Sequence, residues 1–563
     1  MRPRATKIPA KLPLPKSLIS SLQSSTKKKK CYIPQSPLET HFISLIHSSN
    51  STLQLKQIHA KIILHNLSNN SRITTQLISS SSLHKSTEYA LLILRNFQSP
   101  NVYLFNALIR GFSDNTHFKK SIFYFNLMLR LSVKPNWLTL PFVLKSVGAL
   151  GFCRLGMGLH SGAVKWGLEF DSFVRVSLVD MYVKVGFLEF AQKVFDESCE
   201  SVKLGTVLLW NVLIGGWCKA GNLRKALELL EAMPERSTVS WNCLIDGFMR
   251  NGKVDTAVQF FDRIPGKNVA SWTTMISGFS QNGYDEKALS MFFRMLEDGV
   301  RPNDLSIVSA LSACAKFGAF EAGKWIHDFI WKNGFQVNRA IGNALVAMYS
   351  KCGDIESANW VFSQMEEKDL LSWSVMIWGW AIHGHFDLAI QYFEQMELTG
   401  IEPDGVVFLS VLTACSHSGQ VDRGLELFDL MRLDYSIEPT MKHYSLVVDL
   451  FGRSGQLDKA LSFIQSMPIE PDLVIWGTLF SACRAHKNIE MAELASVKIL
   501  ELEPKHPGSF VFLSNVYAAV GRWQDVERIR VYMKHKGVKK DTGWSYIEAE
   551  GRVHSFVAGD HYH

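Results

Sequence analysis

The stretch WNVLIGGWCKAGNLRKALELLEAMPERS, residues 210–237, is closely followed by WNCLIDGFMRNGKVDTAVQFFDRIPGKN, residues 241–268. The two stretches differ at most positions. The Trp-Asn start, the central glycine, the spacing of the apolar residues and the proline near the end nevertheless recur in the same order. This agreement indicates an internal repeat, which has to be defined before any single motif is interpreted.

The repeat extends through most of the chain. Its central glycines are Gly151, Gly186, Gly221, Gly252, Gly283, Gly318, Gly353, Gly384, Gly419 and Gly455, with successive intervals of 35, 35, 31, 31, 35, 35, 31, 35 and 36 residues. Other landmarks keep the same spacing, because the Met-Tyr pairs at 181–182 and 348–349 and the Pro-Asn pairs at 135–136 and 302–303 are both 167 residues apart. A period in this range is typical of solenoid proteins.

One repeat, Val207 to Ser237, has the pattern of two helices. Its first half, VLLWNVLIGGWCKAG, is apolar, and we interpret its strand-like run as buried helix. Gly221 stands where a helix end favours a positive φ, and Pro234 lacks the N–H needed to continue a second helix. The second half places one apolar stripe on a helical face, formed by Leu223, Ala226, Leu227, Leu230 and Met233.

A single helix pair cannot bury both apolar faces, so the pairs must stack on one another. The predicted fold class is therefore all-α, a superhelical α-solenoid of helix-turn-helix repeats. The length of 563 residues, with 47% hydrophobic and 20% charged residues, suits a long solenoid better than one globular core. No uninterrupted apolar run of about 18 residues occurs, so no membrane span is expected.

Residues 1–38 differ from the rest. They contain nine Lys or Arg residues, many Ser and Pro, and no acidic residue before Glu39. This composition predicts an organellar transit peptide; the alternatives are a disordered basic tail or a nuclear signal at Lys27–Lys30. Without this leader the chain has 60 − 9 = 51 basic residues against 52 acidic ones. Nonspecific attraction to phosphate would then be weak, and nucleic-acid binding would rely more on base contacts.

The repeat lengths of 31, 35 and 36 residues, with YSKCG, WNVLIGGWCKAG, AMPERS and GVRPN, resemble the plant pentatricopeptide repeat family. The alternation resembles its PLS subclass, in which P, L and shorter S motifs alternate. The resemblance covers roughly residues 55–563 and implies a right-handed superhelix. Tetratricopeptide repeats keep about 34 residues with a different aromatic signature.

The resemblance divides the chain into five regions. Residues 1–38 are the transit peptide, 39–101 are degenerate opening repeats, 102–472 are the array, 473–540 are two motifs of an E domain, and 541–563 resemble the truncated start of the extension that follows. Within the array, P repeats are 102–136, 269–303 and 370–404; L repeats are 137–171, 304–338 and 405–440; S repeats are 172–206 (lengthened), 207–237, 238–268, 339–369 and 441–472.

In this family each repeat contacts one base of single-stranded RNA through its fifth and its last residue, here called the recognition pair. An Asn amide suits a pyrimidine edge, a Ser or Thr hydroxyl leaves room for a purine, and the last residue donates (Asn) or only accepts (Asp). The resemblance implies the pairs Asn106/Asn136, Asn211/Ser237, Asn242/Asn268, Thr273/Asn303, Asn343/Asp369, Ser374/Asp404 and Ser445/Asp472.

By the family's code, Asn/Asn and Asn/Ser prefer pyrimidines, Thr/Asn prefers A, Asn/Asp prefers U and Ser/Asp prefers G. We expect no base specificity in the repeats whose fifth residue is apolar and cannot hydrogen-bond a base edge, namely those with Pro141, Val176, Val308 and Leu409. The competing interpretation is that Asn and Ser at helix N-termini are ordinary capping residues.

Four tryptophans precede fifth residues, at Trp210, Trp241, Trp272 and Trp373, and we expect them to pack in the core. The residue three positions before the fifth is the better candidate for contact with the face of the base; examples are Tyr103, Val239, Ala270 and Leu371.

We expect neither catalysis nor a metal or other cofactor. Relatives with a C-terminal deaminase need H-x-E and C-x-x-C, and neither pattern occurs in this sequence. Five cysteines (Cys218, Cys314, Cys352, Cys415, Cys483) recur late in the first helix, where we expect a small residue to let the second helix approach. His554 and His561–His563 lack acidic or thiol partners in sequence.

The predicted function is sequence-specific binding of single-stranded RNA in a plant organelle, the mitochondrion ahead of the chloroplast. The protein would select sites for C-to-U editing and recruit a cytidine deaminase in trans through residues 473–563, without membrane contact. The alternatives are an RNA stability, splicing or translation factor, a peptide-binding scaffold of tetratricopeptide type, or an enzyme whose deaminase lies in a longer reading frame.

Overall fold

The computed structural model describes residues 37–98, 100–199, 206–503, 507–536, 544–549 and 552–557. The predicted leader lies almost wholly outside these residues, and so does the insertion at 200–205 in the lengthened S repeat. The chain divides into an N-terminal part, residues 1–266, and a C-terminal part, residues 267–563.

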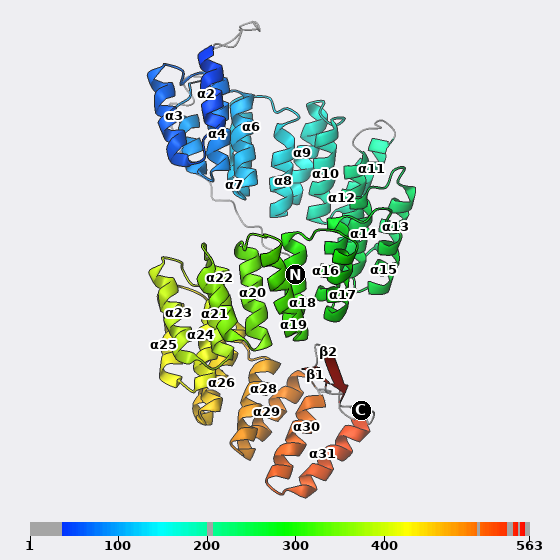
Figure 1. The fold of residues 1–563 in the computed structure, drawn as a ribbon, viewed down its shortest axis with the longest axis vertical. Helices are drawn as coiled ribbons and strands as arrows, with labels where there is room; N and C mark the ends of the chain where they lie inside the picture. The colour runs from blue at the N-terminus through cyan, green and yellow to red at the C-terminus, as the bar shows by residue number, and fades with distance from the viewer. Residues whose placement is uncertain are drawn as a thin grey trace. The chain divides into compact units, whose positions relative to one another are not determined.

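The described N-terminal part consists of antiparallel helix pairs (Figure 1). Its helices are α2 (Pro37–His47), α3 (Thr52–Leu64), α4 (Ser71–Leu83), α5 (Thr87–Arg95), α6 (Val102–Asp114), α7 (Phe118–Arg130), α8 (Thr139–Leu150), α9 (Cys153–Lys165), α10 (Ser172–Val185), α11 (Leu188–Cys199), α12 (Thr206–Lys219), α13 (Leu223–Ala232), α14 (Thr238–Arg250) and α15 (Val254–Asp262).

The C-terminal part continues the same alternation and ends in a short hairpin (Figure 1). Its elements are α16 (Val269–Gln281), α17 (Asp285–Glu297), α18 (Asp304–Phe317), α19 (Phe320–Lys332), α20 (Arg339–Cys352), α21 (Ile355–Gln364), α22 (Leu370–Ile382), α23 (Phe386–Leu398), α24 (Gly405–Ser418), α25 (Val421–Leu433), α26 (Met441–Arg453), α27 (Leu457–Ser466), α28 (Leu473–Ala485), α29 (Ile489–Leu502), α30 (Pro507–Ala519), α31 (Trp523–Lys536), β1 (Trp544–Ala549) and β2 (Arg552–Val557).

The turn between the helices of a pair needs a left-handed residue, and the central glycines supply it. All ten have positive φ, from 67° at Gly151 to 96° at Gly353. Repeats without the glycine make the same turn at higher steric cost, with φ of 62° at Thr116 and 55° at Lys487. The prediction that these glycines end the first helix of each pair is therefore confirmed.

The helix pair predicted from residues 207–237 is also confirmed. The strand-like run forms α12, and α13 ends at Ala232, two residues before Pro234. Ala226, Leu230 and Met233 are at most 2% exposed, so the predicted apolar stripe does face the core.

First helices of successive repeats pack against each other within each part, as α8 does with α10 and α22 with α24. Glycines permit the close approach: a Cβ on Gly247 in α14 would lie 2.2 Å from Cys218 Sγ in α12. The expectation that these cysteines face the second helix is therefore wrong for Cys218, which faces the next first helix. It holds for Cys415, whose Cβ is 3.3 Å from the Cβ position of Gly424 in α25.

The α-solenoid is confirmed, and one element lies outside it. Strands β1 and β2 pair antiparallel, with Trp544 opposite Val557 and Ala549 opposite Arg552. The all-α prediction omitted this hairpin, although WSYIEA and RVHSFV contain the aromatic and β-branched residues that are enriched in strands and stand on either side of Glu-Gly in the sequence. Of the helices described, none has the length and apolar character needed to span a membrane.

Candidate nucleic-acid interface

The last residue of each recognition pair accepts backbone N–H groups at the start of the next repeat's first helix, as its N-cap in all pairs except that of Asn136, which lies two residues before the N-cap Leu138 of α8. Asn303 is representative, because its Oδ1 accepts hydrogen bonds from Ser306 N–H and from Ser306 Oγ, both at 2.9 Å. A carboxyl, amide or hydroxyl oxygen accepts backbone N–H groups in the same way at Asn136, Ser237, Asn268, Asp369, Asp404 and Asp472.

Capping fixes which atom of these side chains remains for a ligand. A backbone N–H can only donate, so the capping atom of an Asn must be its oxygen, and the NH2 group is left over. In an Asp the second carboxylate oxygen, an acceptor, is left over. Capping and base recognition therefore use different atoms, and the capping interpretation does not exclude the recognition interpretation.

The fifth residues lie in the first helices, and most are buried. Asn106, Asn211, Thr273, Asn343 and Ser374 are 5–8% exposed. Hydrogen bonds join two pairs directly, at 2.9 Å from Asn106 Nδ2 to Asn136 Oδ1 and 3.5 Å from Asn343 Nδ2 to Asp369 Oδ1. Thr273 Oγ1 donates its one hydrogen to the carbonyl of Val269 at 2.7 Å and lies 3.4 Å from Asn303 Oδ1. The sequence-predicted partners thus come together across neighbouring repeats.

Other pairs differ. Ser445 Oγ hydrogen-bonds Thr478 Oγ1 of the following helix at 3.2 Å. Asn242 and Asn268 lie in the two different parts of the chain, so their pairing stays a prediction.

Two fifth residues carry buried acceptors that lack a partner within the described structure, Asn211 Oδ1 and Asn343 Oδ1. Most buried polar atoms in proteins are hydrogen-bonded, so these two unpaired oxygens are unusual and make Asn211 and Asn343 candidates for ligand contact.

Asp369 is held as a carboxylate. Partial burial acts to raise its pKa, but hydrogen bonds from the backbone and side chain of Ser372 and from Asn343, together with the charge of Arg339, outweigh it. The pKa of Asp369 is lowered as a result. Its hydrogen bonds from Ser372 and Asn343 converge on Oδ1, which leaves Oδ2 as a second acceptor.

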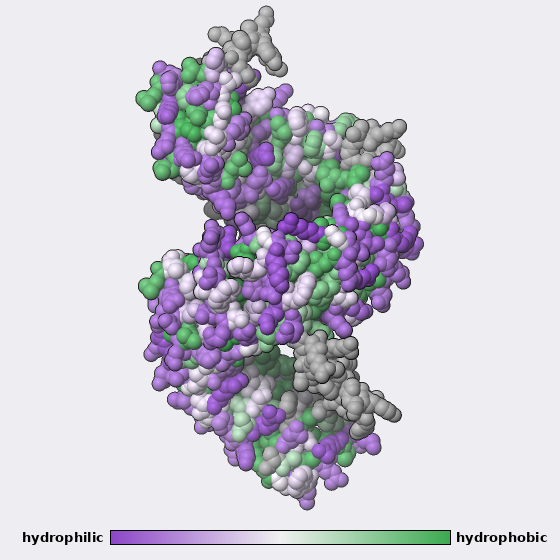
Figure 2. Space-filling model, viewed as in Figure 1, coloured by the Kyte–Doolittle hydropathy of each residue, from purple (hydrophilic) through white to green (hydrophobic). Residues whose placement is uncertain are grey.

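A row of exposed apolar side chains accompanies the recognition pairs. Tyr103, Val239 and Leu371, predicted to contact the face of the base, are 60%, 56% and 57% exposed, and Ala270 is also exposed. Further apolar residues at this second position are exposed as well, namely Leu138, Phe173, Leu208, Leu305, Val406 and Val474. Figure 2 shows hydrophobic residues as separate patches on a largely hydrophilic surface, and a repeated apolar position accounts for part of such a surface without forming one large patch.

The tryptophans before the fifth residues belong to the core, as predicted. Trp210, Trp241, Trp272 and Trp373 are 1–9% exposed. The ring of Trp373 lies 5.0 Å from that of Phe362, centroid to centroid, in an edge-to-face contact. These rings therefore stabilise the helix pairs and do not stack on a base.

The sequence interpretation missed a row of cations. A Lys or Arg stands two residues before the turn glycine in six repeats and is exposed in each: Lys184, Lys219, Arg250, Lys316, Lys351 and Arg453. Each lies eleven residues, about three helical turns, after the second position, so both project from the same side of the first helix. Such cations suit phosphate contacts, although Lys184, Arg250 and Arg453 each also pair with an Asp one turn earlier in the helix, at 2.6–2.7 Å. These cations can be recognised in the sequence because each stands two residues before a turn glycine.

The apolar fifth residues Pro141, Val176, Val308 and Leu409 are half-buried in their helices. Burial raises the pKa of Cys218 and Cys415 to about 12, so their thiols are poor nucleophiles. Within the described residues no cluster of three or more His, Cys, Asp or Glu side chains has the arrangement of a metal site.

Comparison with known proteins agrees with this geometry. The PPR repeat model matches residues 103–133, 176–201, 209–237, 235–265, 270–300, 343–370, 371–401 and 442–470, the pentatricopeptide repeat domain matches 391–454, and the E motif matches 486–548.

Three pentatricopeptide repeat-containing proteins of Arabidopsis thaliana are similar to the chain. One is 53% identical over 97% of this chain and 83% of the relative. A putative member named as mitochondrial is 37% identical, over 82% of this chain and 63% of the relative. One named as chloroplastic is 35% identical, over 92% of this chain and 80% of the relative.

Among solved structures, the pentatricopeptide repeat protein PPR10 in complex with an 18-nt PSAJ RNA element superposes with a TM-score of 0.55. The sequence identity is 16%, over 89% of this chain and 87% of that chain. At this identity the likeness concerns the fold. Together with the matching repeats and the 53% identical relative, it leads to one conclusion: the chain belongs to the pentatricopeptide repeat family.

Proposed function

We propose that the protein binds single-stranded RNA sequence-specifically, with one base per repeat. The observation that carries this proposal is the capping geometry of the last residues. One oxygen of each Asn or Asp is fixed on the helix N-terminus. In the pairs of Asn106, Thr273 and Asn343 this same oxygen lies within 3.5 Å of the fifth residue, which leaves the other donor or acceptor of the last residue for a base. The PPR10 complex, a relative in fold, contains bound RNA.

Each recognition pair then sets one base preference. An outward NH2 group donates to pyrimidine N3 of cytosine or to N1 of adenine, whereas an outward carboxylate oxygen accepts from N3–H of uracil or N1–H of guanine. The row of exposed apolar residues contacts the base faces, and the row of cations contacts phosphates. The repeats with Pro141, Val176, Val308 and Leu409 contribute binding without base preference.

The biological role we propose is site selection for C-to-U editing in a plant organelle. The E motif at residues 486–548 supports this role, because this module is not needed for RNA binding alone. Relatives named as mitochondrial and as chloroplastic support an organelle, with the mitochondrion as our first choice and residues 1–38 as the import signal. The chain itself is proposed to lack catalysis and to recruit a cytidine deaminase through residues 473–563.

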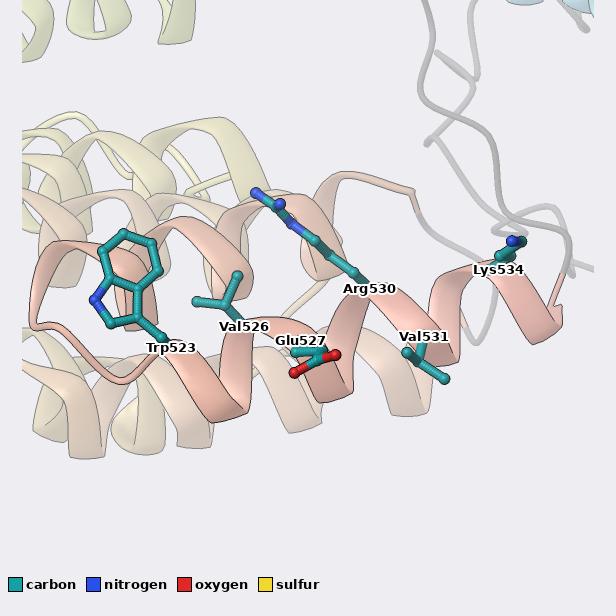
Figure 3. A pocket seen from close by; sticks show the side chains of 6 residues that line it. All are labelled: Trp523, Val526, Glu527, Arg530, Val531 and Lys534. Atoms are coloured by element: carbon teal, nitrogen blue, oxygen red, sulfur yellow. The ribbon is translucent and has the colours of Figure 1, made fainter.

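Helix α31 offers the surface for this recruitment (Figure 3). An open surface pocket runs along it, lined by Trp523, Val526, Glu527, Arg530, Val531 and Lys534. Trp523 is 67% exposed and Val531 is 49% exposed, which places two large apolar side chains on one exposed helix. We propose that the deaminase partner covers this face.

A reconstituted editing assay tests the role. The chain alone, incubated with its RNA and zinc, should convert no cytidine, and addition of the deaminase partner should start conversion. Trp523→Ala should abolish that conversion while RNA binding persists. The matched control is Trp331→Ala in α19, which removes a similarly exposed ring (65%) from a helix outside residues 473–563. Conversion by the pure chain, or equal loss with both variants, would contradict the proposal.

A further inference from the structure

Two repeats carry the same recognition pair in different surroundings. Ser374/Asp404 and Ser445/Asp472 are both expected to prefer guanine. In both, Oδ1 of the Asp accepts two backbone N–H groups at 3.0 Å and Oδ2 remains as a second acceptor. The family's code treats the two repeats as equivalent. The hydroxyl groups of their two serines, however, differ in their hydrogen bonds.

The hydroxyl group of Ser445 has one fixed hydrogen-bond acceptor. Thr478 is the sixth residue of the following repeat, and its Oγ1 lies 2.8 Å from the carbonyl oxygen of Val474 and 3.2 Å from Ser445 Oγ. A carbonyl can only accept, and a hydroxyl has one hydrogen, so Thr478 donates to Val474. Ser445 must therefore donate to Thr478. Its oxygen then presents only lone pairs to a base.

Ser374 lacks this arrangement. The equivalent residue of its following repeat is Ser410, whose Oγ donates to the carbonyl of Val406 at 3.1 Å in the same manner. Within the described structure no hydrogen bond joins Ser374 to Ser410. The hydroxyl of Ser374 can rotate and either donate to a base or accept from it.

We propose that Thr478 is a positioning residue that sharpens the guanine preference of Ser445/Asp472. With the Ser445 hydrogen turned away, the pair consists of two acceptors, which match the N1–H and N2–H2 donors of guanine and repel the N1 acceptor of adenine. This inference rests on the proposed function, since it requires that the fifth and last residues contact the base. Thr478 belongs to the E-domain region, so that region also shapes the recognition of the last base of the array.

The test measures dissociation constants of the full chain at fixed salt, for RNAs with G or A opposite repeat 370–404 or repeat 441–472. The G-over-A ratio should be larger at repeat 441–472. Thr478→Val keeps the shape but removes the acceptor, and should reduce that ratio roughly two- to tenfold, the worth of one hydrogen bond. Thr478→Ser should restore it. The matched control Ser410→Ala should leave both ratios unchanged.

A purely structural role would weaken binding to G and A equally in Thr478→Val, and that result would overturn the inference. Equal ratios at the two repeats, unchanged by Thr478→Val, would overturn it too while the proposed function stands. No discrimination between G and A at either repeat would overturn the assignment of the recognition pairs, and this inference with it.

Discussion

Replacing Asp369 by Asn should change the base preference of repeat 339–369 from U towards C. Oδ1 of Asp369 accepts from Ser372 N–H at 3.0 Å and from Ser372 Oγ at 2.9 Å, and an Asn oxygen can accept both. The outward atom changes from an acceptor to an NH2 donor. Uracil presents N3–H at this point of its edge and cytosine presents a bare N3, so the complementary base changes.

The expected changes in stability and in base preference follow from the helix cap that Asp369→Asn keeps and the base contact that it changes. Asn and Asp are about equally good N-caps, so the free energy of unfolding should change by only a few tenths of a kcal/mol. One well-formed base contact discriminates by about 1–3 kcal/mol in nucleic-acid complexes, which corresponds to roughly five- to 150-fold in the U-over-C ratio. Asp369→Ala is the comparison variant, because it loses both the cap, about 1 kcal/mol of stability, and the discrimination.

The assay is fluorescence anisotropy with RNAs that differ only at the base opposite repeat 339–369, at one salt concentration. We expect the natural chain to prefer U, Asp369→Asn to prefer C, and Asp369→Ala to prefer neither. If Asp369→Asn bound all four RNAs with equally reduced affinity, Asp369 would be a capping residue alone and the recognition assignment would fail at this repeat.

Three further predictions concern stability and can be measured by denaturant unfolding. Trp373→Ala should cost about 3–5 kcal/mol, since it removes a ring that is 6% exposed, while base preference stays the same; a changed preference would place Trp373 at the RNA. Gly353→Ala should cost about 1–2 kcal/mol through backbone strain alone, because φ is 96° and a Cβ there meets nothing within 4 Å; an unchanged stability would contradict this. Burial lowers the pKa of His327 below its usual 6.5, against the smaller opposing effect of Asp328, so the unfolded chain binds the proton more readily. Stability should be fully present above pH 6.5 and should fall as the pH decreases through the lowered pKa, with a slope that His327→Gln reduces.

The repeat and its phase were predictable because local rules impose them. The left-handed turn requires glycine at a fixed place, and the N-cap requires Asn, Asp, Ser or Thr at another, so residues such as Gly353 and Asn303 mark the boundaries of helices directly in the sequence. The burial of Trp373 followed from helical periodicity. The cations at Lys219 and Lys351 were equally predictable, because each stands two residues before a turn glycine.

Other features depend on distances between neighbouring helices and could not be predicted. The hydrogen bond between Ser445 and Thr478 needs two side chains 33 residues apart to meet at 3.2 Å, while the equivalent Ser374 and Ser410 make no such bond. The contact of Cys218 with the Gly247 position is set by how closely α12 and α14 stack. The hairpin of β1 and β2 was missed because the helical period was carried past the end of the solenoid.

We propose that the recognition pairs act in chain order, one base each. Selection of RNAs from a random pool by the full chain is the decisive test of this order. We expect enrichment of 5′-YNNYYANUGNG-3′, where Y is a pyrimidine and N any base, with the unspecified positions at the repeats that carry Pro141, Val176, Val308 and Leu409. Enrichment of bases at those four positions, or of a motif in which the A, U and G positions do not follow this order and spacing, would contradict it.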